Sequence, residues 1–351
     1  MALGVAAGRS LKLGLARNPA ADNPVMQVFR NALPPGSQAH AVTIGNFDGV
    51  HRGHQAMLAL LTNEARHRGL PSCVLTFEPH PRDYFARRAG KSELAPRRIA
   101  TLRDKLAELE RCGFERVVIA RFDERFAAQS PQTFIDDVLL KGLRARYVLV
   151  GDDFRFGAQR AGSYAMLDEA GAKAAGAGFD VARMMSYEVH GQRVSSSAVR
   201  HALAGGDMAR CAALLGRPYS VSGRVVHGKK LGRELGFATL NQRFGHARPA
   251  AMGIFVVHVF GLSDTPLPGV ASLGVRPTVD DSGRVLLETH CLEWPAALGS
   301  DGAYGRCVRV ELLHKLHDER HYASMEALRA GIARDSADAQ AWFKTTRPGL
   351  P

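Results

Sequence analysis

The residues best suited to chemistry in this sequence are two histidines, His51 and His54, in the stretch Gly45-Asn46-Phe47-Asp48-Gly49-Val50-His51-Arg52-Gly53-His54. At a spacing of three they project to the same side of a helical turn. Two imidazoles beside a phosphate chain can donate hydrogen bonds to its oxygens and stabilise the charge that develops as pyrophosphate leaves. The glycines allow close approach of the backbone, and a helix N-terminus offers N–H groups to an anion. Helix capping and a metal pair are the alternatives, although a zinc-binding helix more often carries an HExxH pattern.

Two later stretches carry polar side chains at similar places. Asp152-Asp153-Phe154-Arg155 follows an apolar run that ends at Val150. We interpret it as a ligand site at a strand end, with the Phe154 ring able to stack on a planar aromatic ligand; a simple turn is the alternative. Ser195-Ser196-Ser197 precedes a helical pattern and could cap it while presenting N–H groups to phosphate. Arg200, one turn later, could bind a triphosphate through two hydrogen bonds.

A further glycine-rich, basic stretch lies in the second half of the chain. Gly223 to Lys229 fits the GxxxxGK pattern of a P-loop, but Lys230 follows where a Ser or Thr would bind Mg²⁺. No strand–helix–strand pattern surrounds it either, so we exclude a P-loop. A flexible basic flap over phosphates is still expected, formed by Gly228, Lys229, Lys230, Gly232 and Arg233.

The elements that would position the histidines form an alternating pattern. Between Ala41 and Leu215, apolar runs alternate with helical periodicity, which predicts a parallel, doubly wound α/β sheet. The predicted strands are 41–44, 73–77, 117–120 and 147–150, and the predicted helices are 54–68, 102–111 and 131–141. Ser130 should cap the last helix, with Pro131 at its first position. The histidine stretch therefore joins a strand to a helix, where open α/β sheets bind ligands.

The pattern changes after Arg217-Pro218. Short apolar runs are now separated by loops rich in Gly, Pro and Asp, and helical periodicity returns only near the end. The predicted strands are 219–226, 254–260, 270–273, 285–292 and 308–313, followed by a helix over 324–334. Such an order is typical of a small antiparallel barrel or sandwich closed by a helix.

Length and composition bound the classes of function. A chain of 351 residues, 46% hydrophobic and 23% charged, fits about two ordinary globular domains and excludes a disordered or collagen-like chain. Lys and Arg exceed Asp and Glu by 46 − 34 = 12, without a block of five, which favours small anionic ligands over nucleic acid. The five cysteines include no CxxC pair, which argues against a zinc ribbon or disulfide framework.

The stretch GNFDGVHRGH resembles the HxGH signature of the nucleotidyltransferase superfamily, in the form seen in bacterial bifunctional riboflavin kinase/FAD synthetases. Further segments resemble that family in the same order, at 75–81, 151–157, 194–200, 253–255, 272–278, 287–292, 304–305 and 313–332. The resemblance covers about 26–339. It implies an N-terminal Rossmann-like HxGH nucleotidyltransferase domain and a C-terminal small antiparallel β-barrel riboflavin kinase domain with a terminal helix.

In the N-terminal half, the resemblance implies transfer of AMP from ATP to FMN, with His51 and His54 as catalytic residues. It implies that nucleotide is bound by Gly45, Asn46, Phe47, Asp48, Gly53, Ser196, Ser197 and Arg200, and in the kinase half by Gly228, Lys230, Gly232 and Arg233. The residues implied to bind flavin are Asp152, Asp153, Phe154, Arg155 and Arg320.

In the C-terminal half, the resemblance implies phosphorylation of riboflavin by ATP. Ala238-Thr239-Leu240-Asn241 stands where the family carries PTAN, so Thr239 and Asn241 are the implied Mg²⁺ ligands. The missing proline leaves φ unconstrained there, so the rigidity of this loop is open. Glu288 is the implied base that takes a proton from the ribityl 5′-hydroxyl.

The expected organisation is an extension over 1–25, an FMN adenylyltransferase (FAD synthetase) domain over 26–216, a riboflavin kinase domain over 217–343 and a tail over 344–351. The extension is basic before Asp22; we interpret it as floppy, or as the product of an upstream start codon chosen in error, rather than as a transit peptide. We expect a cytoplasmic monomer or weak homo-oligomer that binds riboflavin, FMN, FAD and ATP, and neither nucleic acid nor membrane. A flavin sensor with an inactive kinase half and a nucleotidyltransferase for another acceptor are the alternatives.

Overall fold

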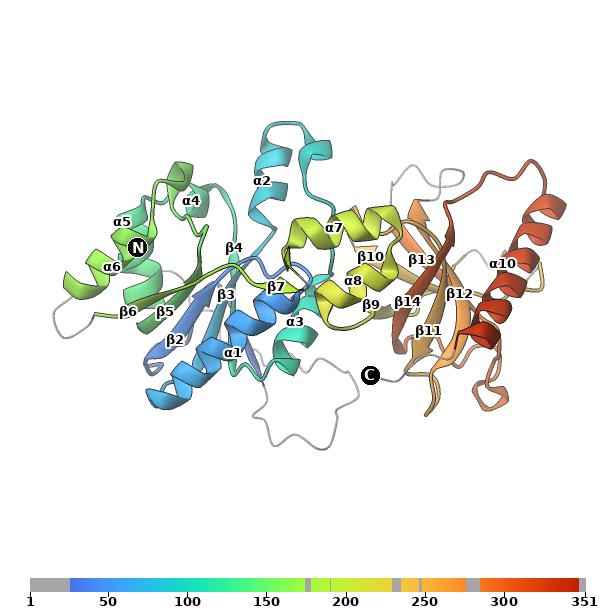
Figure 1. Ribbon diagram of the computed structural model, residues 1–351, viewed down its shortest axis with the longest axis horizontal. Coiled ribbons are helices and arrows are strands. Elements are labelled where there is room, and N and C mark those ends of the chain that lie inside the picture. Colours follow the sequence, from blue (N-terminus) through green and yellow to red (C-terminus); the bar gives the residue numbers. More distant parts are fainter. Residues whose placement is uncertain are drawn as a thin grey trace. The chain divides into compact units, whose positions relative to one another are not determined.

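The computed structural model describes residues 26–173, 178–189, 191–228, 235–245, 248–275 and 285–346. They form two compact units (Figure 1). The first contains the described residues up to Pro96 together with Leu106–Val194, and the second contains Arg97–Lys105 and everything from Ser195 onward. Of the predicted site residues, Lys230, Gly232 and Arg233 lie outside the described residues, as does the extension over 1–25.

The first unit is built on a six-stranded sheet in the order β1-β4-β3-β2-β5-β6. The strands are β1 (Gln27–Arg30), β2 (His40–Ile44), β3 (Ser72–Glu78), β4 (Arg116–Arg121), β5 (Ala145–Gly151) and β6 (Asp180–Met184). All neighbours pair in parallel, which confirms the predicted doubly wound sheet. The central strands are buried on both faces, as their continuous apolar runs require.

Helices connect these strands. They are α1 (Arg52–His67), α2 (Pro81–Arg88), α3 (Leu102–Arg111), α4 (Glu124–Ala127), α5 (Pro131–Thr133), the π-helix η2 (Phe134–Gly142) and α6 (Tyr164–Lys173), with 3₁₀ turns η1 (Ser92–Leu94) and η3 (Ala158–Arg160). Helix α1 buries Leu58, Leu61 and Ala65, which share one helical face. The Ser130 hydroxyl caps α5 as predicted, accepting the Thr133 N–H at 3.0 Å. A small hairpin, β7 (Glu188–Val189) and β8 (Gln192–Arg193), follows β6.

The strand order of this sheet defines where a ligand can enter. From β2 the chain proceeds outward through β3 and β4 on one side, and through β5 and β6 on the other. Strands β2 and β5 are therefore neighbours whose following loops diverge, and their carboxyl ends flank the crevice typical of this topology. The His51 stretch follows β2 and the Asp152 stretch follows β5.

The second unit begins with two helices, α7 (Ser196–Gly205) and α8 (Met208–Leu215), before its sheet. The strands are β9 (Tyr219–Arg224), β10 (Leu240–Gly245), β11 (Gly253–Phe260), β12 (Leu267–Val275), β13 (Val285–Cys291) and β14 (Cys307–His317), with a 3₁₀ turn, η4 (Ala296–Leu298). They pair antiparallel in the order β10-β13-β12-β11-β14-β9.

Two contacts bring the ends of this sheet together. Val226, just past β9, forms a bridge with Asn241 of β10. The buried side chain of Gln242 donates from Nε2 to the carbonyls of Gly223 and Val308, at 3.2 and 3.0 Å. The sheet is therefore a nearly closed barrel, as predicted. Alternate residues of β13 point into its core, which leaves the intervening ones facing outward.

The C-terminal helix α10 (Met325–Thr345) is longer than predicted. Ser324 caps it, in agreement with the predicted start, but the predicted end at 334 is eleven residues early. Buried Asp335 and Ser336 interrupt the apolar periodicity there. Helix α10 also includes the first two residues of the tail expected over 344–351.

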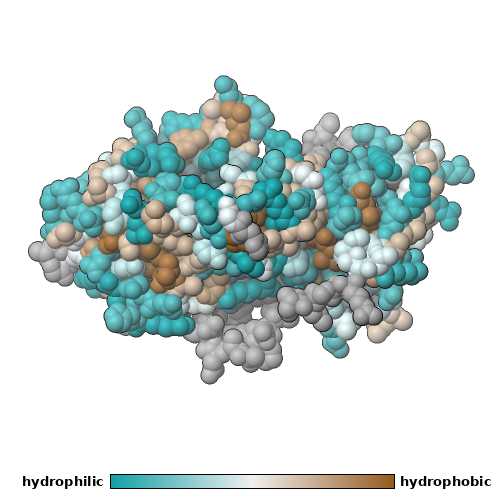
Figure 2. Space-filling view, viewed as in Figure 1, coloured by the Kyte–Doolittle hydropathy of each residue, from teal (hydrophilic) through white to brown (hydrophobic). Residues whose placement is uncertain are grey.

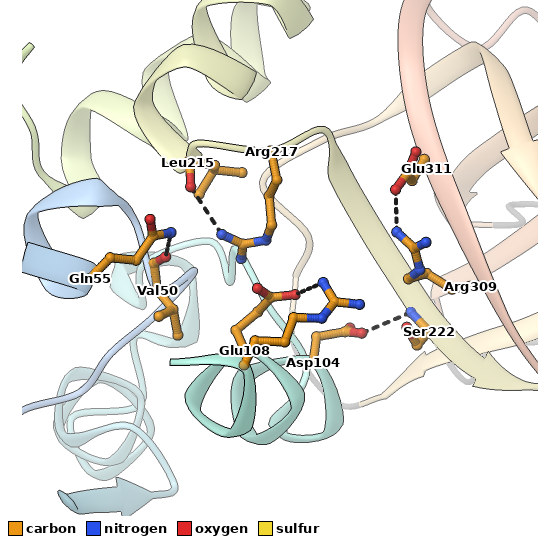
Figure 3. Close-up of polar contacts among 10 residues, drawn as sticks. Val50, Gln55, Asp104, Glu108, Leu215, Arg217, Ser222, Arg309 and Glu311 are labelled. Atoms are coloured by element: carbon orange, nitrogen blue, oxygen red, sulfur yellow. Dashed lines mark hydrogen bonds and ion pairs between the residues drawn. The ribbon is translucent and has the colours of Figure 1, made fainter. Parts of the chain in front are cut away.

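The segment Arg97–Lys105 belongs to the second unit although its neighbours in sequence belong to the first. The Arg98 N–H donates to the Arg248 carbonyl at 2.7 Å, and its carbonyl accepts from Ala250 N–H at 2.9 Å. The Asp104 carboxylate accepts from the Ser222 N–H of β9 at 3.0 Å (Figure 3). This segment is therefore hydrogen-bonded into the barrel unit.

The face of the molecule in Figure 2 is mainly hydrophilic, with only small apolar patches. Among the described residues, no helix is both long and apolar enough to cross a membrane.

Candidate active sites

The turn between β2 and α1 holds both predicted catalytic histidines. His51 is the N-cap of α1, and its Nδ1 accepts the His54 backbone N–H at 3.3 Å. The two rings are stacked, with centroids 3.6 Å apart and planes 14° apart. Because a backbone N–H always donates, a neutral His51 carries its proton on Nε2. His51 can therefore cap the helix with one nitrogen and donate to an anion with the other.

The backbone of this turn is strained. Phe47 and Val50 have φ of 48° and 40°, a region that non-glycine residues rarely occupy. The Val50 carbonyl accepts a hydrogen bond from Gln55 Nε2 at 2.8 Å, which holds the turn from within α1 (Figure 3). Asp48 is buried beside them. Backbone outliers of this kind cost about 1–3 kcal/mol each and cluster at ligand sites, so their position here supports a functional role for the turn.

The glycines of the turn leave room that a side chain would fill. A Cβ on Gly53 would lie 3.3 Å from His51 Nδ1 and 3.5 Å from the Val194 carbonyl oxygen. A Cβ on Gly45 would lie 3.0 Å from the Phe47 ring. Predicted nucleotide-binding residues Gly45, Asn46, Phe47, Asp48 and Gly53 are thus all brought together with the two histidines.

The loop after β5 places the predicted flavin residues at the neighbouring strand end. Asp152 accepts from the Ser186 hydroxyl at 2.6 Å and from Arg193 at 3.3 Å. These contacts, the Ser186 bond above all, lower the pKa of Asp152 and keep it ionised. Phe154 is half-buried and stacks on Phe156 at 5.6 Å. Asp152 therefore ties this loop to the chain around β7 and β8, while exposed Asp153 and Arg155 remain accessible.

A cluster of aromatic rings at the ends of β3 and β4 was not singled out from the sequence. It consists of Phe77, Tyr84, Phe85, Phe122 and Phe126, with ring centroids 5.3–5.9 Å apart and mostly edge-to-face. Phe85 is 51% exposed, which is unusual for a large apolar ring. Three of these rings lie on segments whose apolar residues show no periodicity that would indicate a site. Only the abundance of Phe and Tyr in these segments could have identified the cluster.

The predicted phosphate-binding residues of the serine run belong to the second unit. The Ser195 hydroxyl accepts the Ala198 N–H at 3.2 Å and so caps α7, which places Ser196 and Ser197 in its first turn. Arg200 donates from Nε to the Arg97 carbonyl at 2.7 Å. One edge of its guanidinium is therefore held by the segment that hydrogen-bonds into the barrel unit.

In the barrel, strand register brings the predicted kinase residues together. Asn241 of β10 pairs with Glu288 of β13, and Glu288 pairs with Ser272 of β12. Residues paired in this way share one face of the sheet. Glu288 alternates with the buried Leu287 and Thr289, so it lies on the outer face of the barrel and is half-buried there.

The loop before β10 contains the altered PTAN-like segment. Asn241 is buried and donates from Nδ2 to the Thr239 carbonyl at 3.3 Å, which leaves its Oδ1 as the oxygen suited to a cation. The Ala238 carbonyl accepts from His290 Nδ1 at 3.0 Å. A Cβ on Gly228 would lie 2.6 Å from Asn241 Nδ2. The start of the predicted flap is therefore packed directly on the predicted metal ligand.

The donor set near Glu288 is compatible with Mg²⁺. Thr239, Asn241 and Glu288 offer hard oxygen ligands, and Mg²⁺ in phosphoryl-transfer sites uses few protein ligands plus substrate phosphates. The described residues contain no cluster of three or more His, Cys, Asp and Glu that could hold a metal ion.

All five cysteines are free thiols, and burial raises the pKa of Cys73 to about 12.

Two family models match the chain. The FAD synthetase model matches residues 34–198, and the riboflavin kinase model matches residues 215–343. Together they cover both candidate sites, in the order predicted from the motifs. A crystal structure of a macrolide-efflux protein from Streptococcus pneumoniae is similar with a TM-score of 0.69 at 25% identity, covering 90% of this chain and 99% of that one.

Curated relatives match over most of their length. The bifunctional riboflavin kinase/FMN adenylyltransferase of Escherichia coli (strain K12) is 46% identical over 307 residues, which is 88% of this chain and 94% of the relative. Those of Pseudomonas fluorescens and Haemophilus influenzae are 42% and 41% identical, covering 90% and 88% of this chain and 97% and 96% of the relatives. Riboflavin kinase and FMN adenylyltransferase are thus the activities of this chain, which belongs to the family of bifunctional riboflavin kinase/FMN adenylyltransferases.

Proposed function

We propose that the two activities are divided between two sites, with adenylylation at the β2–α1 turn and riboflavin phosphorylation at Glu288. The observation that carries this proposal is the place of His51 and His54. Their rings stack at the N-terminus of α1, in a strained turn that follows β2 at the switch point of the sheet.

For adenylylation, the phosphate of FMN attacks the α-phosphorus of ATP in line, and pyrophosphate leaves. No covalent intermediate on the protein is needed, because positioning and charge stabilisation are sufficient for this reaction. His51 and His54 donate hydrogen bonds to the phosphate oxygens as charge develops on the leaving group. Gly45, Gly53 and the first turn of α1 provide close backbone approach and N–H donors.

The aromatic cluster offers a surface for the isoalloxazine ring of FMN. Exposed Phe85 and half-buried Tyr84 and Phe122 present ring edges and faces that favour stacking. Asp153, Phe154 and Arg155 remain candidates for further flavin contacts on the β5 side. Ser196, Ser197 and Arg200 remain candidates for the triphosphate.

For phosphorylation, Glu288 takes the proton from the 5′-hydroxyl of riboflavin as this oxygen attacks the γ-phosphorus of ATP. Thr239 and Asn241 would hold Mg²⁺ against the ATP phosphates. A magnesium ion held there would neutralise charge on the transferred group. Gly228, Lys230, Gly232 and Arg233 remain the proposed flap over the phosphates, and Arg320 a proposed flavin contact.

The remaining proposals concern the whole protein. We propose domain boundaries at 26–216 and 217–343, a cytoplasmic location and a monomer or weak homo-oligomer. The dispersed positive charge, without a basic block, supports small anionic substrates rather than nucleic acid as partners.

The test is a product time course by flavin chromatography, started with either riboflavin or FMN together with ATP and Mg²⁺. We expect His54→Ala to lower FAD formation by about 10²- to 10³-fold and to spare FMN formation. Glu288→Gln should lower FMN formation from riboflavin by about 10²- to 10⁴-fold and leave FAD formation from FMN intact. If each substitution damaged both steps equally, the proposed division between the two sites would be wrong.

A further inference from the structure

The turn that joins β14 to α10 is anchored by a histidine with two partners. His317 lies at the end of β14, with its Nδ1 2.7 Å from the Asp318 carbonyl oxygen and its Nε2 2.8 Å from Asp335 Oδ1 in α10. Its side chain is only 15% exposed, and that of Asp335 11%. The contact is therefore largely removed from water, where a charge-assisted hydrogen bond is strongest.

Both partners of this histidine are acceptors. A carbonyl oxygen and an ionised carboxylate accept hydrogen bonds and cannot donate them. The imidazole ring lies between the two and bridges them, with one ring nitrogen toward each. His317 therefore links the turn after β14 to α10.

A second anchor lies one helical turn away. Tyr322 packs with its hydroxyl against Gly331 of α10, so closely that a Cβ on Gly331 would collide with it. Gly331 and Asp335 are four residues apart and share one face of the helix. The turn 318–321 is thus held to the same face of α10 at both of its ends.

The same turn reaches the proposed kinase site. The Ser272 hydroxyl donates to Glu319 Oε1 at 3.2 Å, and the Glu319 carboxylate lies directly on Gly274, leaving no space for a Cβ there. Ser272 is the register partner of Glu288. Arg320, the proposed flavin contact, is the next residue of the turn. The position of this turn beside Glu288 therefore depends on how firmly it is anchored.

We propose that His317, which bridges Asp335 and the Asp318 carbonyl, is a positioning residue of the riboflavin kinase site that holds the Asp318–Arg320 turn beside Glu288. The proposal rests on the assignment of the kinase step to Glu288. It makes riboflavin binding in that step dependent on the contacts of one histidine. The adenylylation step is independent of it.

The groups around His317 show what its loss would leave behind. Asp335 faces it from α10, Asp318 and Lys315 from its own strand and turn, and uncharged Ile254 is its partner in β11. Lys315 donates to Asp318 Oδ1 at 2.5 Å, and this bond lowers the pKa of the Asp318 carboxyl. Without the imidazole, the Asp335 carboxylate and the Asp318 carbonyl lose this shared partner, so the turn loosens.

The test compares the KM for riboflavin in the kinase step of the wild-type protein with that of two variants, at one pH. His317→Gln, whose side chain cannot bridge both acceptors, should raise this KM about 5- to 10-fold, the change expected for loss of one charge-assisted hydrogen bond, and leave kcat nearly unchanged. His317→Arg, which can donate to both acceptors, should keep a KM close to that of the wild-type protein.

Two further variants separate positioning from folding. Asp335→Asn should raise the KM for riboflavin, because it removes the negative partner of His317. His314→Gln is the matched control, since His314 lies in the same strand and stacks on Trp342 of α10; it should keep the wild-type KM. FAD formation from FMN should be unchanged in all four.

A His317→Gln protein with the wild-type KM would overturn the proposal, as would a His317→Arg protein whose KM is as high as that of His317→Gln. Both outcomes leave the kinase assignment intact, because FMN is still made. Absence of FMN formation in the wild-type protein would instead overturn the assignment itself and the role of His317 with it.

Discussion

His51 both caps a helix and is proposed to bind phosphate, and the two roles can be separated by substitution. In the wild-type protein the His54 N–H donates to His51 Nδ1 at 3.3 Å, and the two ring centroids lie 3.6 Å apart. His51→Ala removes both this acceptor and the stacked ring. Loss of the cap costs about 1 kcal/mol, and loss of the stack about 1 kcal/mol more. In His51→Asn the side-chain oxygen can accept the same N–H, because Asn is among the best N-cap residues. Only the stack is then lost.

The expected results follow from this difference. His51→Ala should melt lower than His51→Asn by about 2–4 °C in a thermal scan, the shift that corresponds to one cap. Both should form FAD from FMN about 10²- to 10³-fold more slowly than the wild-type protein, since neither has a donor at the Nε2 position. Rates are measured by flavin chromatography at saturating ATP. If His51→Asn regained both stability and the rate of FAD formation, His51 would be a cap only and the mechanism would fail.

Three other predictions concern separate parts of the chain. Gly228→Ala should lower riboflavin kinase kcat/KM by about tenfold through the collision of its Cβ with Asn241, while Gly205→Ala, which has open space, should have no effect on the same assay. Burial lowers the pKa of His40 from 6.5 to about 4, so the unfolded chain binds this proton more readily. Denaturant unfolding should therefore show on the order of 3 kcal/mol of stability lost as pH falls from about 6.5 to about 4. His40→Gln should show a smaller dependence of the free energy of unfolding on pH. Phe85→Ala should raise the KM for FMN by about 5- to 30-fold without changing the KM for riboflavin, the loss expected for one stacked ring, and an unchanged KM would exclude the aromatic cluster as the flavin surface.

Much of the first unit could be predicted because its signals are local. The continuous apolar runs of the central strands, the Ser130 cap and the glycine-punctuated histidine turn each depend on neighbouring residues. The predicted helix over 131–141 shows the limit. It becomes a π-helix from Phe134 because Leu143 N–H bonds to the Val138 carbonyl, and Gly142 tolerates a backbone oxygen at 2.9 Å from its Cβ position. Apolar periodicity alone does not distinguish an α-helix from a π-helix.

The parts that could not be predicted depend on contacts between distant residues. Helix α10 continues past 334 because buried Asp335 is satisfied by His317, eighteen positions earlier, and Ser336 by the Ile332 carbonyl. The apolar periodicity of the sequence does not predict either of these hydrogen bonds. The pairing of Asn241 with Glu288 depends on the strand register of the closed barrel, which the sequence pattern does not predict either.

The placement of Arg97–Lys105 in the second unit has a consequence for how this protein can be divided. The described chain passes from one unit to the other after Pro96, again inside α3 after Lys105, and a third time after Val194. A protease that cuts once between the halves leaves them joined by the remaining crossings, and a gene fragment that begins at residue 217 omits the backbone that pairs with Arg248 and Ala250. Transferring the barrel unit into another enzyme therefore requires that the nine residues Arg97–Lys105 be transferred with it.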